Sequence, residues 1–398
     1  MSYSIDSDKL YDYYRDLDRR RADLEVDEAE VAETEAQAKR DEERYALSQS
    51  QLMWRKFARN KAALVGGIVV LLFYIGAAFA QFIAPYDLQT RFRERIYLPP
   101  QPVHFFDEGR LQPFVYGLTQ TMDPVSFRRT YVRDLDQKYP IRFFAEGEPY
   151  KLLGLFPTAI HLFQADGGPI NLLGTDRQGR DLFSRIFIGS QISLTIGLVG
   201  VLLSLVLGTV LGVISGFFGG WIDELIQRTI ELVRSFPSIP LWMALSAAVP
   251  VNWPPLWTYF AVTLILSLIG WTWLARQLRG KVLSLRAEDY ITAAKLMGAT
   301  NYRIIFRHLI PASIGHIIVV STLAMPSMIL AETALSFLGL GLQPPITSWG
   351  VLIKEVQDIQ SIAIYPWVFS PVLFVVAAIL AFNFLGDGLR DAADPYTR

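Results

Sequence analysis

Hydrophobic residues along this chain occur in long uncharged stretches that alternate with charged ones. A bilayer core about 30 Å thick is crossed by about 20 apolar residues in a helix. Six stretches reach this length, so the pattern predicts an all-α protein that crosses a membrane six times. The predicted spans are Leu64–Ile83, Gln191–Phe217, Leu225–Val249, Leu256–Leu274, Leu309–Leu338 and Trp367–Leu385.

The third predicted span is the weakest of the six. Glu231, Arg234, Pro237 and Pro240 interrupt its apolar pattern. Because proline lacks a backbone N–H donor, we expect a bend at Ser235–Pro237. This span is therefore expected to begin as a polar helix on the cytoplasmic side.

The charges beside the apolar stretches predict how the chain is oriented. Before the first span, Gln51–Ala63 interleaves aromatic with basic residues. Helices of this kind lie in the headgroup layer, and basic flanks stay in the cytoplasm. Six crossings then return the C-terminus to the cytoplasm and place the basic loop Ala275–His308 there as well.

The same pattern divides the chain into a membrane core and flanking parts. Residues 1–53 are expected to form a charged cytoplasmic tail, and residues 54–83 an interfacial helix with the first span. A periplasmic insertion is expected at 84–188, the membrane core at 189–386 and a cytoplasmic tail at 387–398. We interpret the N-terminal tail as a solvated arm, with a regulatory docking helix as the alternative.

The insertion at residues 84–188 is rich in proline and aromatic residues. Within it, Ile141–Phe144 and Tyr150–Leu153 flank the turn-like sequence Glu146–Pro149, which predicts a β-hairpin. We interpret the insertion as a small folded cap of mixed structure on the periplasmic side. Contact with a partner and shielding of the mouth of the membrane core are equal alternatives.

Composition excludes several classes of protein. The formal net charge of −1 over 398 residues gives no reason to expect nucleic acid as a partner. No cysteine is present, which rules out disulfides, thiol catalysis and thiolate metal sites. The sequence contains no Gly-rich phosphate loop ending in Lys-Ser/Thr, and no His-Glu-x-x-His. It therefore predicts no catalytic residue, no metal site and no bound cofactor.

Ionisable residues are also scarce inside the predicted spans. Charged groups at membrane depth are costly and tend to mark ion pathways. In the fifth span, His316 and Glu332 each lie nearer an end than the middle. A proton-coupled transporter is expected to hold carboxylates near the midplane. The energy for any transport should then come from another subunit.

The loop between the fourth and fifth spans predicts a short helix, a turn and a second helix. Glu288 and Asp289 favour a helix start, and Gly298 suits the left-handed conformation that ends a helix. Ala293 and Ala294 are expected to leave a shallow surface on which another protein packs. On geometry alone, a docking element and a plain connector both remain open.

This loop resembles the Glu-Ala-Ala loop of ABC importer permeases, which forms the coupling helix that seats in a groove of the ATPase subunit. Thr292 stands where that family usually has glutamate, which weakens any claim of a specific salt bridge from that position. The resemblance implies an ATPase-coupling loop that contains Asp289, Thr292, Ala293, Ala294, Gly298, Ala299 and Pro311.

Other segments resemble the second permease of the dipeptide and oligopeptide importers, in matching order. Trp54–Lys61 precedes the first span, and Leu385–Pro395 matches the C-terminal tail. The motif before the second span contains Gly174, Thr175, Asp176, Gly179, Arg180 and Asp181. The motif at the end of the fifth span contains Glu332, Gly339, Gly341 and Trp349.

Two features of these segments have structural interpretations. Glu332 is interpreted as a carboxylate satisfied by a backbone partner rather than as part of a gate. The glycines of the second span are interpreted as packing sites between helices rather than substrate contacts. They are Gly197, Gly200, Gly208, Gly212 and Gly216.

The resemblance implies a type-1 ABC importer permease that hydrolyses no ATP itself. Its implied partners are a homologous permease in a heterodimer, two ATPase subunits that hold ATP and Mg, and a periplasmic solute-binding protein. It is expected in the bacterial inner membrane with both termini in the cytoplasm.

The cargo and two rival classes stay open at this point. Peptides are the expected cargo, with oligosaccharides, opines or nickel as alternatives. A stand-alone secondary transporter and a non-transporting scaffold are the rival classes. Co-purification with an ATP-binding subunit separates the importer from both.

Overall fold

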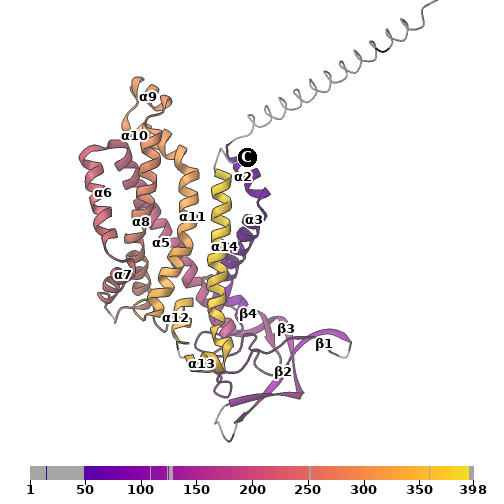
Figure 1. Ribbon diagram of the computed structural model, residues 1–398. Helices are drawn as coiled ribbons and strands as arrows, with labels where there is room; N and C mark the ends of the chain where they lie inside the picture. Colours follow the sequence, from indigo (N-terminus) through magenta and orange to yellow (C-terminus); the bar gives the residue numbers. More distant parts are fainter. Residues whose placement is uncertain are drawn as a thin grey trace, which may run out of the picture.

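The computed structural model describes residue 15 and residues 49–393, except 108, 123, 125–128, 251 and 358. Nearly all of the predicted N-terminal tail, and the Asp394-Pro395 end of the C-terminal tail, lie outside the described residues. Within the described part, a helical body carries one β-sheet at its end (Figure 1). The predicted fold class, helical in the membrane with a mixed insertion, is confirmed.

Five helices in the described residues are long and apolar enough to cross a membrane, and they match five of the six predicted spans. They are α3 (Lys61–Ala78), α5 (Leu182–Phe218), α8 (Pro255–Leu285), α11 (Ile310–Phe337) and α14 (Ser370–Ala393). The π-helical turn η1 (Ile305–Leu309) leads into α11, and the 3-10 turn η2 (Pro366–Phe369) into α14. Short helices complete the body: α2 (Gln49–Arg59), α4 (Ala80–Ile83), α12 (Trp349–Lys354) and α13 (Ile359–Ile364).

The third predicted span consists of two helices rather than one. α6 (Gly220–Ser235) ends where Phe236 becomes extended, and α7 (Ser238–Ala247) begins after Pro237. A residue before proline is disfavoured in the helical region, so the break falls at this step. The predicted bend is confirmed, but a continuous third span is not formed. Figure 1 shows α6 and α7 end to end beside α8.

Close backbone contact joins α5 to α8. A Cβ atom placed on Gly212 would lie 2.7 Å from the carbonyl oxygen of Ala275. Gly208 and Gly216 lie about one turn away on either side. A Cβ atom placed on either of them would also lie 2.9 Å from an atom of α8. Small residues at this spacing allow membrane helices to approach closely. The packing interpretation of the second-span glycines is confirmed, since Gly197 and Gly200 likewise face α11.

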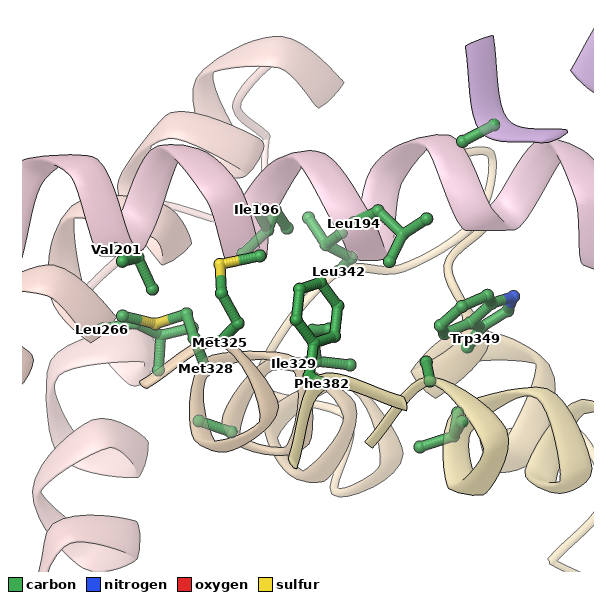
Figure 2. Packing of buried hydrophobic residues seen from close by; sticks show 14 of the residues in the cluster. Leu194, Ile196, Val201, Leu266, Met325, Met328, Ile329, Leu342, Trp349 and Phe382 are labelled. Carbon is green, nitrogen blue, oxygen red and sulfur yellow. The ribbon is translucent and has the colours of Figure 1, made fainter. Parts of the chain in front are cut away.

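An apolar cluster fills the centre of the bundle, between α3, α5, α8, α11, α12 and α14. Figure 2 shows Leu194 and Ile196 of α5 facing Met325 and Ile329 of α11. Trp349, at the start of α12, is fully buried at the edge of the same cluster. The cluster fixes the sheet-side halves of α5 and α11 relative to each other.

The insertion forms a four-stranded antiparallel sheet in the order β1-β2-β3-β4. Its strands are β1 (His104–Asp107), β2 (Arg110–Met122), β3 (Arg129–Leu152) and β4 (Phe156–Ala165). The hairpin predicted around Glu146–Pro149 is wrong, because both of its arms belong to the single strand β3. The pairing of β3 with β4 shifts between Glu146 and Tyr150, so the extra residues are absorbed as an irregularity without reversing the chain.

The sheet is fixed to the end of the first span by short polar contacts. The carbonyl oxygen of Ala84 lies 2.6 Å from Nδ1 of His161 in β4. Gln164 Nε2 donates to the carbonyl oxygen of Pro85 at 2.6 Å. The rings of Phe82 and Phe144 meet with centroids 6.0 Å apart. The sheet therefore packs as a cap against this end of the bundle, and Figure 1 shows the α8–α11 loop at the opposite end.

Candidate functional site

The loop between α8 and α11 folds as α9 (Asp289–Leu296) and α10 (Asn301–Ile304). Gly298 follows the C-cap of α9, and its φ of +78° is the left-handed conformation expected there. The N–H of Ala299 donates to the carbonyl oxygen of Ala294 at 3.0 Å, and that of Gly298 to Lys295 at 3.0 Å. This pair of bonds is a Schellman motif, which closes a helix rigidly. The second helix is capped by Thr300, whose side chain accepts from Arg303 N.

The two neighbouring alanines of α9 differ in exposure. Ala294 is 4% exposed and Ile291 is fully buried. Ile291 belongs to an apolar cluster with Val213 of α5 and Leu278 of α8. Ala293 is exposed. The expectation that both alanines form an outer surface is therefore wrong for Ala294, because it lies on the inward face.

The outward side of this loop carries large apolar side chains. Leu296 is 85% exposed and Met297 82%. Beyond the turn, Tyr302 and Phe306 are exposed and their ring centroids lie 4.4 Å apart. Clustered exposed apolar side chains typically mark an interaction surface. Of the other predicted loop residues, Asp289, Thr292 and Pro311 are exposed, and Ala299 is half-buried.

The motif before α5 is a tight loop in which two glycines have left-handed conformations. Gly174 has a φ of +76° and Gly179 a φ of +74°. A Cβ on Gly179 would collide with the carbonyl oxygen of Phe92, and one on Gly174 with that of Leu98. Thr175 Oγ1 accepts from the N–H of Leu98 at 2.9 Å. The loop is therefore fastened to the segment after α4, and only glycine fits at these two positions.

Asp176, Arg180, Arg185 and Glu355 form a buried ion network. Asp176 Oδ2 lies 2.7 Å from both Arg180 Nε and Arg185 Nη1. Glu355 Oε2 lies 2.7 Å from Arg180 Nη2 and 2.6 Å from Arg185 Nη1. The four side chains are between 2% and 13% exposed. Two carboxylates and two guanidinium groups balance in charge, so the network ties the start of α5 to the end of α12.

Asp181 caps the N-terminus of α5. Its Oδ2 accepts from Ser184 N and from Ser184 Oγ, each at 2.7 Å, and its Oδ1 accepts from Asn171 Nδ2 at 3.0 Å. An acidic cap of this kind satisfies free N–H groups at the helix start. Burial nevertheless raises the pKa of the Asp181 carboxyl to about 6, against the opposing effect of its three hydrogen bonds.

Glu332 is fully buried and accepts hydrogen bonds from three serine hydroxyls. Ser348 Oγ and Ser336 Oγ donate to its Oε1 at 2.7 and 2.8 Å, and Ser193 Oγ donates to its Oε2 at 3.2 Å. Each of these hydroxyls also accepts from a backbone N–H, of Val351, Leu342 and Trp349 respectively. The carboxylate is therefore satisfied, as interpreted, but by side-chain hydroxyls rather than by the backbone.

The remaining residues of that motif shape the turn after α11. Gly339 has a φ of +82°, and a Cβ on Gly341 would lie 2.6 Å from Ser336 N. Trp349 Nε1 donates to the carbonyl oxygen of Ile186 at 3.1 Å. These contacts hold the α11–α12 turn against α5.

Ser348 stands beside Trp349 in the segment that resembles the family after the fifth span, but its bond to Glu332 was not predicted. Sequence reasoning missed Glu355 and Ser193, which complete the two networks. They contact residues up to 175 positions away, and nothing in their local sequence marks them. The structure brings the motif before α5 and the motif after α11 together at the sheet end. It leaves the α9 loop at the other end (Figure 1).

A large cavity of about 1840 Å³ lies between α8, α11, α14 and the first span. Most of its lining is apolar, including Trp273, Met328 and Leu385. A few polar groups also face it, among them Gln277 and His316. No group of three or more potential metal ligands occurs in the part of the chain that the structure describes.

Comparison with known proteins places these features in a family. Residues 208–398 match the family model described as binding-protein-dependent transport system inner membrane component. Residues 48–100 match the N-terminal transmembrane domain of oligopeptide transport permease C. A glutathione transport system permease protein GsiD from Pectobacterium atrosepticum is 32% identical over 342 residues, covering 86% of this chain and 89% of that protein.

The chain belongs to the binding-protein-dependent transport permeases. A dipeptide transport system permease protein DppC from Bacillus subtilis is 30% identical, covering 89% of this chain and 88% of that protein. An oligopeptide transport system permease protein OppC from Salmonella typhimurium is 43% identical over 226 residues, covering 56% of this chain and 72% of that protein. The resemblance predicted from the motifs is confirmed.

Membership of this permease family establishes where the chain acts and which parts of transport it performs. The chain is a multi-pass protein of the inner membrane and the membrane subunit of an ABC importer, not a catalytic one. ATP hydrolysis belongs to a partner ATPase, and solute is delivered by a binding protein.

Proposed function

We propose that this permease carries peptides across the inner membrane as one half of a heterodimer with a homologous permease. The names of these relatives concern dipeptides, oligopeptides and glutathione, which are all peptides or peptide-like. The chain covers nearly the full length of two of them, which supports carrying their cargo class over to this chain. The cavity between α8, α11 and α14 offers a mostly apolar space of suitable size for a short peptide.

The observation that best supports the proposal is the structure of the α9 loop. It presents exposed Leu296 and Met297 from a helix that is closed by a Schellman motif and anchored through buried Ile291. We assign Asp289, Thr292, Ala293, Gly298 and Ala299 to the surface that contacts an ATPase subunit. Ala294 and Pro311 are assigned to the support of that surface.

The mechanism follows from how α9 is attached. Ile291 belongs to a buried apolar cluster that also contains Val213 of α5 and Leu278 of α8. Two ATPase subunits, which hold ATP and Mg, would move α9 when they close, and α5 and α8 would move with it. The glycine stripe between α5 and α8 makes these two helices a tightly packed pair, so the displacement reaches the cavity that they help to line.

The proposed orientation places α9 and both termini in the cytoplasm and the sheet in the periplasm. α2, the end of α14 and α9 lie at one end of the bundle, and the sheet lies at the other (Figure 1). The basic residues within α2 and in the α8–α11 loop support this orientation.

Reconstitution tests the proposed function. The complete importer, with its second permease, its ATPases and its binding protein, is placed in proteoliposomes. Uptake of radiolabelled peptides of two to five residues is then measured with and without internal ATP. ATP-dependent peptide uptake is expected, with oligosaccharides and opines of similar size taken up at background level. Preferred uptake of a sugar oligomer or an opine would replace the cargo assignment, and uptake without ATPases would overturn the mechanism.

A further inference from the structure

A second cavity, of about 590 Å³, lies beside the buried ion network at the sheet end of the bundle. The loop after α4, the start of α5 and the segment leading through α12 form its walls. Five basic side chains and one acidic side chain line it: Arg91, Arg177, Arg180, Arg185, Lys354 and Glu355. None of its lining residues is shared with the larger apolar cavity.

The charge of this basic pocket is not balanced within the described residues. Arg180 and Arg185 are paired with Glu355 and with Asp176 behind it. Arg91, Arg177 and Lys354 form no ion pair with any residue that the structure describes. Three of the lining residues therefore carry positive charges without an ion-pair partner in the described residues. Arg91 and Arg177 are exposed at the rim of the pocket, and the Lys354 ammonium lies beside Gly339, where a Cβ atom would be 2.6 Å from Nζ.

Two buried polar atoms in the wall also have no hydrogen-bond partner. Arg185 is 2% exposed, yet its Nε donates to nothing in the described residues. The Oε1 atom of Gln178 is also buried without a partner, but it is an acceptor and gives no support to an anionic occupant. Leaving a buried donor unpaired is unfavourable, and an oxygen atom that enters the pocket removes this cost. Geometry and charge thus both favour a carboxylate as occupant.

We propose that this pocket receives an acidic side chain of the solute-binding protein when that protein docks on the periplasmic face. The proposal rests on the function and orientation proposed above. The pocket opens at the end opposite α9 and is separate from the cavity assigned to cargo, so a docked protein reaches it without obstructing the path. A carboxylate there forms charge-assisted hydrogen bonds with guanidinium groups, which fix the register of the two proteins.

Charge reversal tests the proposal in the complete importer reconstituted in nanodiscs. The pocket variant is Arg91→Glu with Arg177→Glu and Lys354→Glu. The matched control is Arg110→Glu with Arg133→Glu and Lys151→Glu, three exposed basic residues of the sheet outside the pocket. The Kd of fluorescently labelled binding protein is measured at low and at physiological salt. The pocket variant is expected to raise the Kd about tenfold and to flatten its salt dependence, while the control changes it less than about twofold.

A neutral variant, with glutamine at the same three positions, is the control for misfolding. Its Kd is expected to lie between those of the unmodified chain and the charge-reversed pocket variant. Equal effects of pocket and control variants, or no effect of either, would overturn the proposal. A second arm compares uptake of peptides with free and amidated C-termini. If the pocket variant binds the solute-binding protein normally but no longer distinguishes free from amidated peptides, the occupant is the carboxylate of the cargo and the proposal is wrong.

The same preparations separate this inference from the proposed function. Absence of ATP-dependent peptide uptake by the unmodified importer removes the proposed function and the inference that rests on it. Normal uptake by the unmodified importer together with normal docking of the pocket variant removes the inference alone.

Discussion

The side chains of Arg185 and Glu355, 170 residues apart in the sequence, form two hydrogen bonds. Nη1 lies 2.6 Å from Oε2, and Nη2 lies 3.1 Å from Oε1. Arg185 stands in the first turn of α5, and Glu355 directly follows α12. A bidentate pair of this kind fixes orientation as well as distance. The start of the second span is therefore held in place by the segment that follows the fifth.

Removing Glu355 should leave two buried guanidinium groups with one carboxylate. For Glu355→Gln we expect a loss of about 3 kcal/mol in the free energy of unfolding, because breaking a buried pair leaves an uncompensated charge. Thermal unfolding of the purified permease measures it. Glu224→Gln is the matched control, since Glu224 forms only an exposed ion pair with Arg228 and should change stability by less than about 0.5 kcal/mol. Equal shifts for the two variants would refute a stabilising role for the network.

Replacing Glu332 should loosen the turn between α11 and α12. Glu332→Ala removes the acceptor of three buried serine hydroxyls, and we expect it to lower the free energy of unfolding by about 3 kcal/mol. Glu332→Gln should cost less, because the amide oxygen still accepts from two of them. Glu288→Ala serves as the control, since Glu288 makes no capping bond at the start of α9. Unchanged thermal stability of Glu332→Ala would show that the carboxylate is dispensable.

Asp181 should make stability depend on pH in a defined window. Its pKa is about 6 in the folded chain and about 3.9 in an unfolded one. The folded state therefore binds more protons between these values, so the contribution of Asp181 is present below about pH 4 and lost as pH rises through 6. Asp181→Asn keeps an oxygen at the cap but cannot titrate.

The measurement compares the thermal midpoints of the unmodified chain and of Asp181→Asn from pH 4 to pH 8. The advantage of the unmodified chain should shrink between pH 4 and pH 6 and stay constant above pH 7. A difference that is flat across the whole range would contradict a raised pKa at this cap.

A charge on the outer face of α9 should uncouple ATP hydrolysis from transport. Ala293→Glu places a carboxylate among exposed apolar side chains, and we expect peptide uptake to fall at least tenfold while membrane insertion is unchanged. Ala62→Glu, at another exposed alanine near the same end of the bundle, should transport normally. Ala294→Glu should instead destabilise the chain, because Ala294 is buried. Full uptake by Ala293→Glu would remove the assignment of this face to the ATPase.

The spans were predictable because about 20 apolar residues are a local property of the sequence. The inward face of α9 was equally readable: Ile291 and Ala294, three positions apart, lie on one side of a helix. Treating the two neighbouring alanines as one surface ignored that period. The third span failed as one helix because Pro237 prevents continuity.

The hairpin prediction failed for a different reason. Glu146–Pro149 has turn-like composition, but Gly147 serves close packing: a Cβ there would lie 2.5 Å from Gln164 Nε2. Composition does not distinguish a glycine required by a turn from one required by a neighbouring strand. The contacts of Arg185 with Glu355, and of Glu332 with Ser193 and Ser348, were beyond sequence reasoning, since these residues meet only through the tertiary fold.

The unbroken length of α5 limits how the sequences of such permeases can diverge. It runs unbroken for 37 residues, about 55 Å, from Arg185 in the ion network to Val213 in the cluster that holds Ile291. One inserted or deleted residue would rotate one end by about 100° relative to the other, so that Arg185 and Val213 could not both keep their contacts. Relatives are therefore free to exchange apolar residues within this helix, whereas the number of residues between its two ends must stay constant.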